Sequence, residues 1–540
     1  MTRAFAAISL TVLLLAPQQA FEVADIHTSP RTTNNFMRAM LRGGRYEIHN
    51  ATMVDLIRTA YSIDADKVLG GPNWLEFDRF DVIAKADSKT SQDSLKLMLQ
   101  ALLADRFKLM VHKDTQSIGG FALTVGKGKP KLKESASPDK PGCQRQAQAP
   151  LTTVEGQIRL PMNSVSCHNM TMEAFASELR GMDPTYFSNA VVDSTGLKGF
   201  WDFDLKWAIK GNLRLAGPDA VTISEAVDKQ LGLKIEEQKI PTPVIVVDQV
   251  DRKPTDNPPD VNTRVPALPP AEFEVADVKP TVPGSRPTGP IMLGFQPGGR
   301  VNLPGFPLAL AIQIAWNTNG NIADIPGAPK WITSTNFDII GKAPAEYVPS
   351  NGPTPGFEEL GPMLQGLLKD RFKMKVHYED QMVTAYTLVA AKPKLKKADP
   401  SSRIGCKTGN APNAVAAGPL PIAARLVTCQ NITMAQFVDQ LQALAGTSYI
   451  RYPVLDATGI EGAWDFSFTF SPINPTQIAG ARGAPPSGGA GPADIGAADP
   501  VGGVSLFDAV EKQLGLKLEA QKRMYTVFVI DHIDEKPTDN

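Results

Sequence analysis

Two histidines are the first candidates for chemistry in this sequence. The chain has six histidines, and His112 and His377 occupy matching places in two similar stretches, each six residues after an Asp-Arg pair. A histidine close to a carboxylate can act as a general acid or base. Both histidines also fall on the polar side of an alternating strand pattern. We therefore favour an ordinary surface position over catalysis, because it is the environment that marks a catalytic histidine.

Two arginines and two tryptophans are candidates for ligand binding. Arg106 and Arg371 stand where a helix pattern passes into a strand pattern, and Trp74 and Trp331 follow Gly-x-Pro turns. A planar guanidinium can bind an acidic ligand, although a local ion pair or a cap on helix carbonyls uses it equally well. Tryptophans near turns can form a platform for sugar or peptide, but large aromatic side chains more often fill a core.

Sequence motifs for known chemistries are absent. The sequence has no G-x-S-x-G, no H-E-x-x-H, no C-x-x-C and no G-x-x-x-x-G-K-[ST]. These would indicate a serine nucleophile, a zinc protease, a redox centre and a phosphate loop, respectively. We therefore expect no cofactor, no metal site and no catalytic residue of a recognised kind, and an enzyme is the less favoured interpretation.

A long internal repeat organises the chain. FEVAD at 21–25 returns at 273–277, and KPTDN at 253–257 returns at 536–540, with further matches between them. Self-similarity over such a length indicates two tandem homologous domains.

Composition sets the limits of these domains. A segment between the copies is rich in proline, which is typical of a semi-rigid linker. The second copy carries an insertion rich in Gly, Ala and Pro at 471–503, which reads as a flexible loop. We predict a signal peptide at 1–20, a first repeat domain at 21–256, a linker at 257–271 and a second repeat domain at 272–540.

The four cysteines follow the repeat. Cys143 and Cys167 in the first copy match Cys406 and Cys429 in the second, so one disulfide within each copy is the economical pairing. Each bond would close a loop of some two dozen residues and contribute roughly 3 kcal/mol on the chain-entropy model. A metal site is the competing interpretation, but His168 after Cys167 has no counterpart after Cys429.

Hydrophobic periodicity predicts the local structure. Leucines and methionines at 95–103 recur with the spacing of one helix face, and the second copy repeats this spacing. The residues at 107–112 then alternate in polarity as on a half-buried strand, and a second strand is expected at 121–125.

The second part of each copy has a similar order of elements. Helices are expected to start near Thr52, Thr171 and Thr433, whose side chains can cap them, and Gly232 and Gly515 suit helix ends. Each copy thus reads as two α-β-β-α-β-β halves. The predicted fold class is α+β, with antiparallel sheets and helices on one face.

These segments resemble a known family. FEVAD at 21–25, GGPNW at 70–74, LLADRFK at 102–108, DSTGL at 193–197 and KQLGLK at 229–234 are similar to the uncharacterised Solibacter-type exported protein family, domain of unknown function 3738. The resemblance covers the mature chain, once per copy. It implies an exported bacterial protein and brings no catalytic residues with it.

The second copy departs from that pattern. GAPKW at 327–331 replaces GGPNW, and LPGFP at 303–307 replaces the helix start at Thr52. If the first copy binds something through this region, we expect the second copy to have lost it.

The charge balance and the N-terminal segment indicate the cellular location of the protein. Its 55 basic and 56 acidic residues nearly balance, which gives no electrostatic case for nucleic acid or an anionic membrane. Arg3 precedes an apolar stretch at 4–16, as in a secretory signal peptide. No other segment has the roughly 20 apolar residues of a membrane span. We expect an exported protein, periplasmic or extracellular, with an uncleaved, tethering signal segment as the alternative.

Export, duplication and scarce catalytic motifs favour a non-enzymatic binding or sensing module. Its partner would be a protein, peptide or glycan of the cell envelope. A cell-envelope hydrolase is the alternative, and it would need His, Asp and Ser side chains close together. A purely structural role is a third option.

Overall fold

Helices begin and end in the computed structural model where the sequence predicts. Thr52, Thr171 and Thr433 each accept a hydrogen bond from the backbone N–H three residues later. This satisfies one of the donors that a helix start leaves free. Gly232 and Gly515 end the later helices with φ angles of 69° and 66°, which glycine adopts at little cost. These predictions are confirmed.

The predicted signal peptide, apart from residues 19 and 20, and most of the predicted insertion lie outside the described residues. The structure describes residues 19–29, 37–135, 140–146, 152–154, 157–159, 162–184, 186–187, 189–209, 213–267, 270–282, 295–318, 322, 325–348, 357–410, 424–446, 449–450, 452–472 and 504–538.

The first half of copy one is a four-stranded sheet covered by two helices. Its strand order is β1-β5-β3-β2, with all neighbours antiparallel. The elements are β1 (Ala24–Thr28), β2 (Arg38–Arg42), β3 (Arg45–Thr52), α1 (Met53–Tyr61), β4 (Val68–Gly70), β5 (Arg79–Lys85), α2 (Gln92–Arg106) and β6 (Met110–Val125).

The second half of copy one repeats this plan. Its sheet has the order β7-β13-β11-β8, and β9 and β10 form a separate hairpin. The elements are β7 (Lys133–Glu134), β8 (Gly142–Arg145), β9 (Thr152–Val154), β10 (Gln157–Arg159), β11 (Asn163–Met170), α3 (Met172–Met182), β12 (Val191–Asp193), β13 (Trp201–Trp207), α4 (Leu213–Ala216), α5 (Ile223–Ala226), the π-helical turn η4 (Val227–Leu231) and β14 (Leu233–Gln249).

Copy two follows the same order. Its first sheet has the order β15-β17-β16 and its last sheet the order β19-β23-β21-β20. The elements are β15 (Val275–Pro280), β16 (Arg300–Pro307), α7 (Leu308–Trp316), β17 (Asn336–Lys342), α8 (Phe357–Arg371), β18 (Lys375–Ala390), β19 (Lys396–Lys397), β20 (Gly405–Asn410), β21 (Arg425–Ile432), α9 (Met434–Ala445), β22 (Leu455–Asp456), β23 (Trp464–Phe470), α11 (Leu506–Leu514) and β24 (Leu516–His532).

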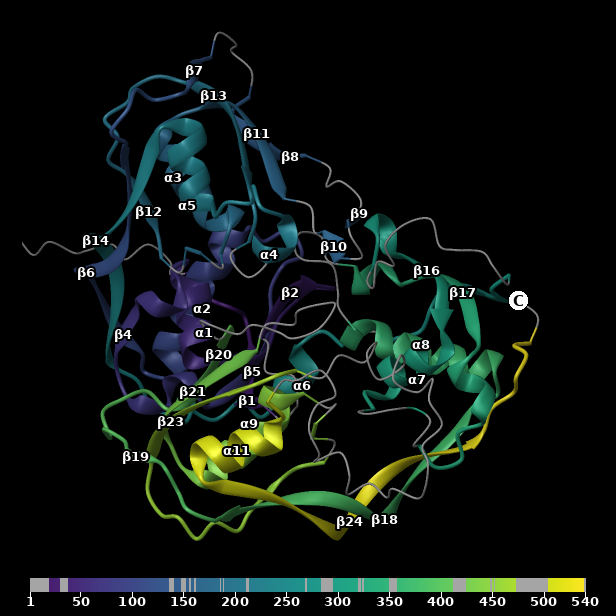
Figure 1. Ribbon diagram of the computed structural model, residues 1–540. Helices are drawn as coiled ribbons and strands as arrows, with labels where there is room; N and C mark the ends of the chain where they lie inside the picture. The colour runs from purple at the N-terminus through teal and green to yellow at the C-terminus, as the bar shows by residue number, and fades with distance from the viewer. Residues whose placement is uncertain are drawn as a thin grey trace, which may run out of the picture.

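One long antiparallel strand pair joins the halves of each copy. β6 and β14 pair over their whole length, from Met110 opposite Gln249 to Val125 opposite Leu233, and β18 and β24 pair in the same way. Figure 1 shows β6 and β14 running along one side of copy one, with α1 and α2 at one end and α3 and α5 at the other. The two strands predicted after each second helix are therefore one continuous strand.

Short parallel strands border these long antiparallel pairs, and the sequence patterns did not predict them. β4 runs parallel to β14, and β12 runs parallel to β6. In copy two, β22 runs parallel to β18. In copy one, each half thus adds a strand next to the long strand that leads out of the other half, which fixes the two halves to one another.

Each half has its own buried core. Leu95, Leu99 and Leu103 of α2 face the first core, as the helix spacing predicts. Phe175 and Leu205 lie in the second core, and copy two has two further cores of the same kind. The α+β fold class and the two tandem homologous domains are confirmed.

The predicted disulfides are present. Cys143 bonds to Cys167 and Cys406 bonds to Cys429, closing loops of 24 and 23 residues. Each bond joins two neighbouring strands, β8 to β11 and β20 to β21. The described residues contain no free cysteine.

The segment between the copies is partly structured. The helix α6 (Val261–Arg264) lies within the predicted linker. Val261 and Val265 are buried with Val23 and pack against Ile83 of β5. Apolar contacts of this kind hold the described part of the linker against the first sheet, which a Pro-rich composition does not by itself predict.

Candidate functional site

Arg106 is buried and hydrogen-bonded within copy one. Its side chain donates to the hydroxyl and the carbonyl of Thr255 at 2.9 and 2.6 Å, to the Asn257 amide oxygen at 2.6 Å and to the Ala24 carbonyl at 3.1 Å. The residue is only 6% exposed, and burial lowers its pKa. The arginine therefore clamps the KPTDN segment to β1, and its binding of an acidic ligand remains a prediction.

Arg371 lies in the matching place in copy two. Its guanidinium is 3.3 Å from the Asp370 carboxylate and donates to the Ala276 carbonyl over 3.4 Å. Its own carbonyl accepts from the Thr538 N–H at 2.8 Å, as that of Arg106 does from Thr255. The threonine of the KPTDN motif thus makes the same backbone hydrogen bond in both copies.

The two candidate tryptophans pack against their own cores. Trp74 is 7% exposed and meets Phe80 edge to face, with ring centroids 6.4 Å apart. Trp331 is partly buried against the first core of copy two. Both lie in short 3-10 helices, η2 (Asn73–Glu76) and η7 (Lys330–Thr333). The tryptophans therefore anchor the preceding turns, and a direct contact of either with a ligand remains a prediction.

The turn of copy one that contains Trp74 holds a segment of copy two. The Ile404 N–H donates to the Asn73 carbonyl at 3.0 Å. The Asn73 side-chain amide donates to the Pro400 carbonyl at 3.2 Å, and the Arg403 guanidinium donates to the Gly70 carbonyl. Figure 1 shows the β20, β21 and β23 sheet of copy two beside the first half of copy one. We call Gly70–Glu76 the copy-one turn and residues 399–407 the docked segment.

Glycine gives the copy-one turn its shape. Gly70 and Gly71 have φ angles of 66° and 68°, a region that other residues rarely adopt. A Cβ atom on Gly71 would lie 2.8 Å from a methyl carbon of Val247 and 2.9 Å from one of Leu75. The turn therefore lies directly against β14, with its carbonyls available to the docked segment.

Charges match across this contact. Lys407 lies 3.4 Å from the Glu76 carboxylate. Burial lowers the pKa of Arg403, while the Glu76 carboxylate opposes this change. The copy-one turn is thus acidic and the docked segment basic, which favours this pairing over others.

The contact works in one direction only. Pro141 stands two residues before Cys143, where Ile404 stands before Cys406. Proline has no backbone N–H, so the corresponding segment of copy one cannot make the bond that Ile404 makes. This asymmetry follows from the sequence but has meaning only once the contact is known.

A second recurring feature is a carboxylate clamp in all four halves. A strand bulge before each first helix holds one residue with a φ angle between 47° and 62°. That residue's N–H donates to an aspartate on the neighbouring strand. The pairs are Asn50 with Asp81, Asn169 with Asp202, Gly305 with Asp338 and Asn431 with Asp465, at 2.8, 2.8, 2.7 and 2.9 Å.

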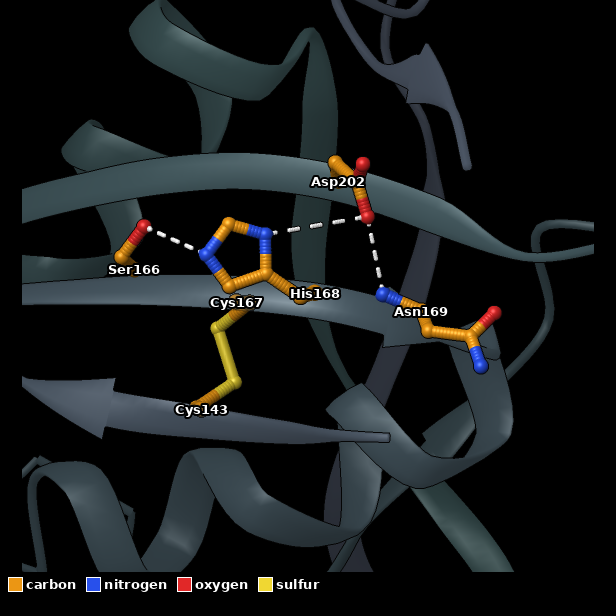
Figure 2. The surroundings of a disulfide bond; sticks show 6 residues. All are labelled: Cys143, Ser166, Cys167, His168, Asn169 and Asp202. Atoms are coloured by element: carbon orange, nitrogen blue, oxygen red, sulfur yellow. Dashed lines mark hydrogen bonds and ion pairs between the residues drawn. A yellow bond between two sulfur atoms is a disulfide. The ribbon is translucent and has the colours of Figure 1, made fainter. Parts of the chain in front are cut away.

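In the second half of copy one, this clamp brings a serine, a histidine and an aspartate together. The Ser166 hydroxyl is 3.3 Å from His168 Nε2, and His168 Nδ1 is 3.9 Å from Asp202. Figure 2 shows His168 between the other two side chains, beside the Cys143–Cys167 disulfide. The order matches nucleophile, base and orienting acid. The histidine to aspartate distance is longer than a hydrogen bond, and the histidine side chain is 60% exposed.

The first half of copy one has a related group with different chemistry. His49 lies 3.6 Å from Asp81 and 3.9 Å from Glu47, and these carboxylates raise its pKa to about 9. Burial raises the pKa of Glu47, but His49 and the charges of Arg42 and Arg45 outweigh it and bring that pKa to about 2. A histidine that stays protonated between two carboxylates neutralises buried charge and does not serve as a base.

The two histidines that recur in the sequence each pair with an aspartate across the long strands. His112 Nδ1 is 2.9 Å from Asp248, and His377 Nδ1 is 2.7 Å from Asp531. Asp531 raises the pKa of His377. Both histidines are exposed, as expected for the polar side of a strand.

The part of the chain that the structure describes shows neither a metal site nor a membrane-spanning helix. No group of three or more His, Cys, Asp or Glu residues there is arranged to hold a metal ion. None of the helices there has the length and apolar composition for crossing a bilayer.

Comparison with known proteins places both copies in one family. The model of the family described as "Protein of unknown function (DUF3738)" matches residues 54–250 and again residues 309–533. The chain belongs to this family. The matched regions of this DUF3738 chain contain the copy-one turn, all four clamp aspartates and both disulfides. No curated protein and no solved structure is detectably similar to it.

Sequence reasoning missed two of these features. The docked segment carries no motif, and it lies more than 300 residues from its partner turn. The Ser166, His168 and Asp202 group did have a signal, because His-Asn-x-Thr occurs at both 49–52 and 168–171.

Proposed function

We propose that this DUF3738 protein is an extracytoplasmic, non-enzymatic binding module for extended peptide segments. The observation that carries the proposal is the copy-one turn, which holds the docked segment through its carbonyls at Gly70 and Asn73. Main-chain recognition of this kind gives affinity for many sequences, while neighbouring side chains give specificity. Here Glu76 supplies that selectivity for a basic segment.

The docked segment already occupies the copy-one turn, and this affects how a partner can bind there. A tethered segment reaches an effective concentration on the order of millimolar with a short flexible connection. A peptide from outside must therefore compete with the docked segment or use another turn. Such competition suits a sensing role, because partner binding would release copy two from copy one.

Export fits this role. Disulfides persist in oxidising compartments outside the cytoplasm, and both copies carry one. We infer a periplasmic or extracellular protein whose partner is a protein, peptide or glycan of the cell envelope. The N-terminal signal segment, cleaved or retained as a tether, belongs to the same proposal.

A peptide added in trans tests the proposal. The probe is a fluorescent peptide of residues 397–409 with serine at position 406. In the R403A/I404P variant of the full chain, the internal segment is weakened and the copy-one turn is accessible. We expect the probe to bind this variant and to bind the wild-type chain at least ten-fold more weakly. If the variant binds neither this peptide nor any protein, peptide or glycan from envelope extracts, the proposal fails.

A cell-envelope hydrolase is the second candidate, and one observation favours it. Ser166, His168 and Asp202 lie in the order of a serine hydrolase triad, and no equivalent histidine occurs in copy two, where Gln430 replaces it. A fluorophosphonate probe tests this candidate. Labelling of wild type that is lost in S166A would establish a reactive serine, and labelling equal in both would remove the candidate.

A further inference from the structure

The corresponding turn of copy two lies on the same structural frame. Gly327 has a φ angle of 76°, and a Cβ atom placed on it would overlap the Ile530 carbonyl of β24. Pro326 accepts a hydrogen bond from the Ile530 N–H at 3.0 Å. Gly70 and Gly71 pack on Val247 of β14 in the same manner. We call Gly327–Thr333 the copy-two turn.

The copy-two turn keeps the groups that hold a peptide main chain. Lys330 takes the place of Asn73, and its carbonyl accepts a hydrogen bond from the exposed Thr333 hydroxyl at 3.0 Å. A hydroxyl donor can rotate away to solvent, so a peptide N–H can take its place at this carbonyl, as the Ile404 N–H does at the Asn73 carbonyl. Trp331 and the buried Ile332 anchor the turn from below.

The side chains of the copy-two turn reverse the charge of the copy-one turn. Thr333 stands where Glu76 stands, and Lys330 replaces the neutral Asn73. Lys330 is exposed, and in the described part of the chain no carboxylate lies within ion-pairing distance of its amino group. A basic segment such as 399–407 is therefore disfavoured at this turn.

We propose that the copy-two turn binds an extended acidic peptide from a partner molecule. This inference rests on the proposed function and names the partner chemistry of a second site. The peptide donates a backbone N–H to the Lys330 carbonyl and places a carboxylate near the Lys330 amino group. It has a residue other than proline at the donating position, because proline has no backbone N–H to donate.

Two peptides and two full-length proteins test the proposal by fluorescence anisotropy. The native peptide is 397–409 with serine at position 406, which has three basic residues and one acidic residue. The charge-reversed peptide adds Arg403→Glu and Lys407→Glu. We expect wild type to bind the charge-reversed peptide roughly 3- to 10-fold tighter than the native one, which is the effect of exchanging a repulsive exposed ion pair for an attractive one. K330E should reverse this preference.

The outcomes separate the two proposals. K140A, at an exposed lysine of copy one, is the matched control and should bind as wild type does. Equal binding of both peptides by wild type, or an unchanged preference in K330E, overturns the acidic-peptide site. In that case the R403A/I404P experiment still decides whether the copy-one turn binds peptide. Circular dichroism of K330E confirms that its fold is intact.

Discussion

Replacing Ile404 with proline removes one defined bond between the two copies. The Ile404 N–H donates to the Asn73 carbonyl at 3.0 Å, and proline has no N–H to donate. Pro141 already occupies the matching place in copy one, so the substitution converts one copy into the pattern of the other. Loss of such a bond costs about 0.5–1.5 kcal/mol, and the carbonyl left without its donor adds to that cost.

Arg403→Ala extends the perturbation to the charged part of the contact. The guanidinium donates to the Gly70 carbonyl, and a hydrogen bond from a charged group is worth about 1.5–3 kcal/mol. One nitrogen of the same group, Nη1, is buried without a hydrogen-bond partner. Because burial of charge offsets part of the gain, we expect a net loss of about 1 kcal/mol. R403A/I404P should therefore weaken the contact between the copies by about 2–3 kcal/mol.

Urea unfolding measures this loss. The contact stabilises whichever copy unfolds first, so the first transition should move to lower urea. With a denaturant dependence of about 3 kcal/mol per molar, R403A/I404P should lower the first midpoint by roughly 0.7–1 M. K140A, at the copy-one position matching Arg403, should leave it unchanged. An R403A/I404P midpoint equal to that of wild type would refute the reasoning.

Three further predictions concern stability. C143S/C167S should cost about 3 kcal/mol in thermal unfolding, since the bond closes a loop of 24 residues; a loss below about 1 kcal/mol would contradict the loop-closure account. D465A should cost about 2 kcal/mol in urea, because the Asn431 N–H loses a charged acceptor at 2.9 Å, and unchanged stability would remove the clamp from the account. The pKa of His49 is about 9 when folded, above its unfolded value of 6.5. Its stabilising effect should thus be complete below pH 6.5 and lost as pH rises through 9; an NMR titration midpoint near 6.5 would count against this.

Local signals in the sequence predicted much of the fold. Thr171 caps α3 through its own side chain, and Gly515 ends α11 in the left-handed region. Both effects act within a few residues, so they are readable without the fold. The disulfide pairing was predictable too, because the repeat places one cysteine pair in each copy.

The length of the long strands depends on tertiary pairing, which local sequence signals do not show. Gly119 and Gly120 on β6, and Pro241 and Pro243 on β14, look like breaks between strands. The two strands pair across all four positions, since each supplies the other with a continuous partner. A local pattern cannot report such pairing.

The candidate site needed the fold for the same reason. Asn73 and Ile404 lie far apart in the sequence, so no local pattern links them. A turn of the same shape occurs in copy two without a docked segment in the described residues. The Gly-Gly-Pro-Asn-Trp motif was visible in the sequence as a unit. Its partner became identifiable only when the two copies were seen together.

Zero-length carbodiimide cross-linking tests the contact between the copies most directly. The reagent joins an amine to a carboxylate that it already touches, and Lys407 lies 3.4 Å from Glu76. In the monomeric full-length protein, we predict a peptide pair linked through Glu76 and Lys407 that disappears in E76Q. Absence of this link in the monomer, or its presence only between separate molecules, would contradict the account.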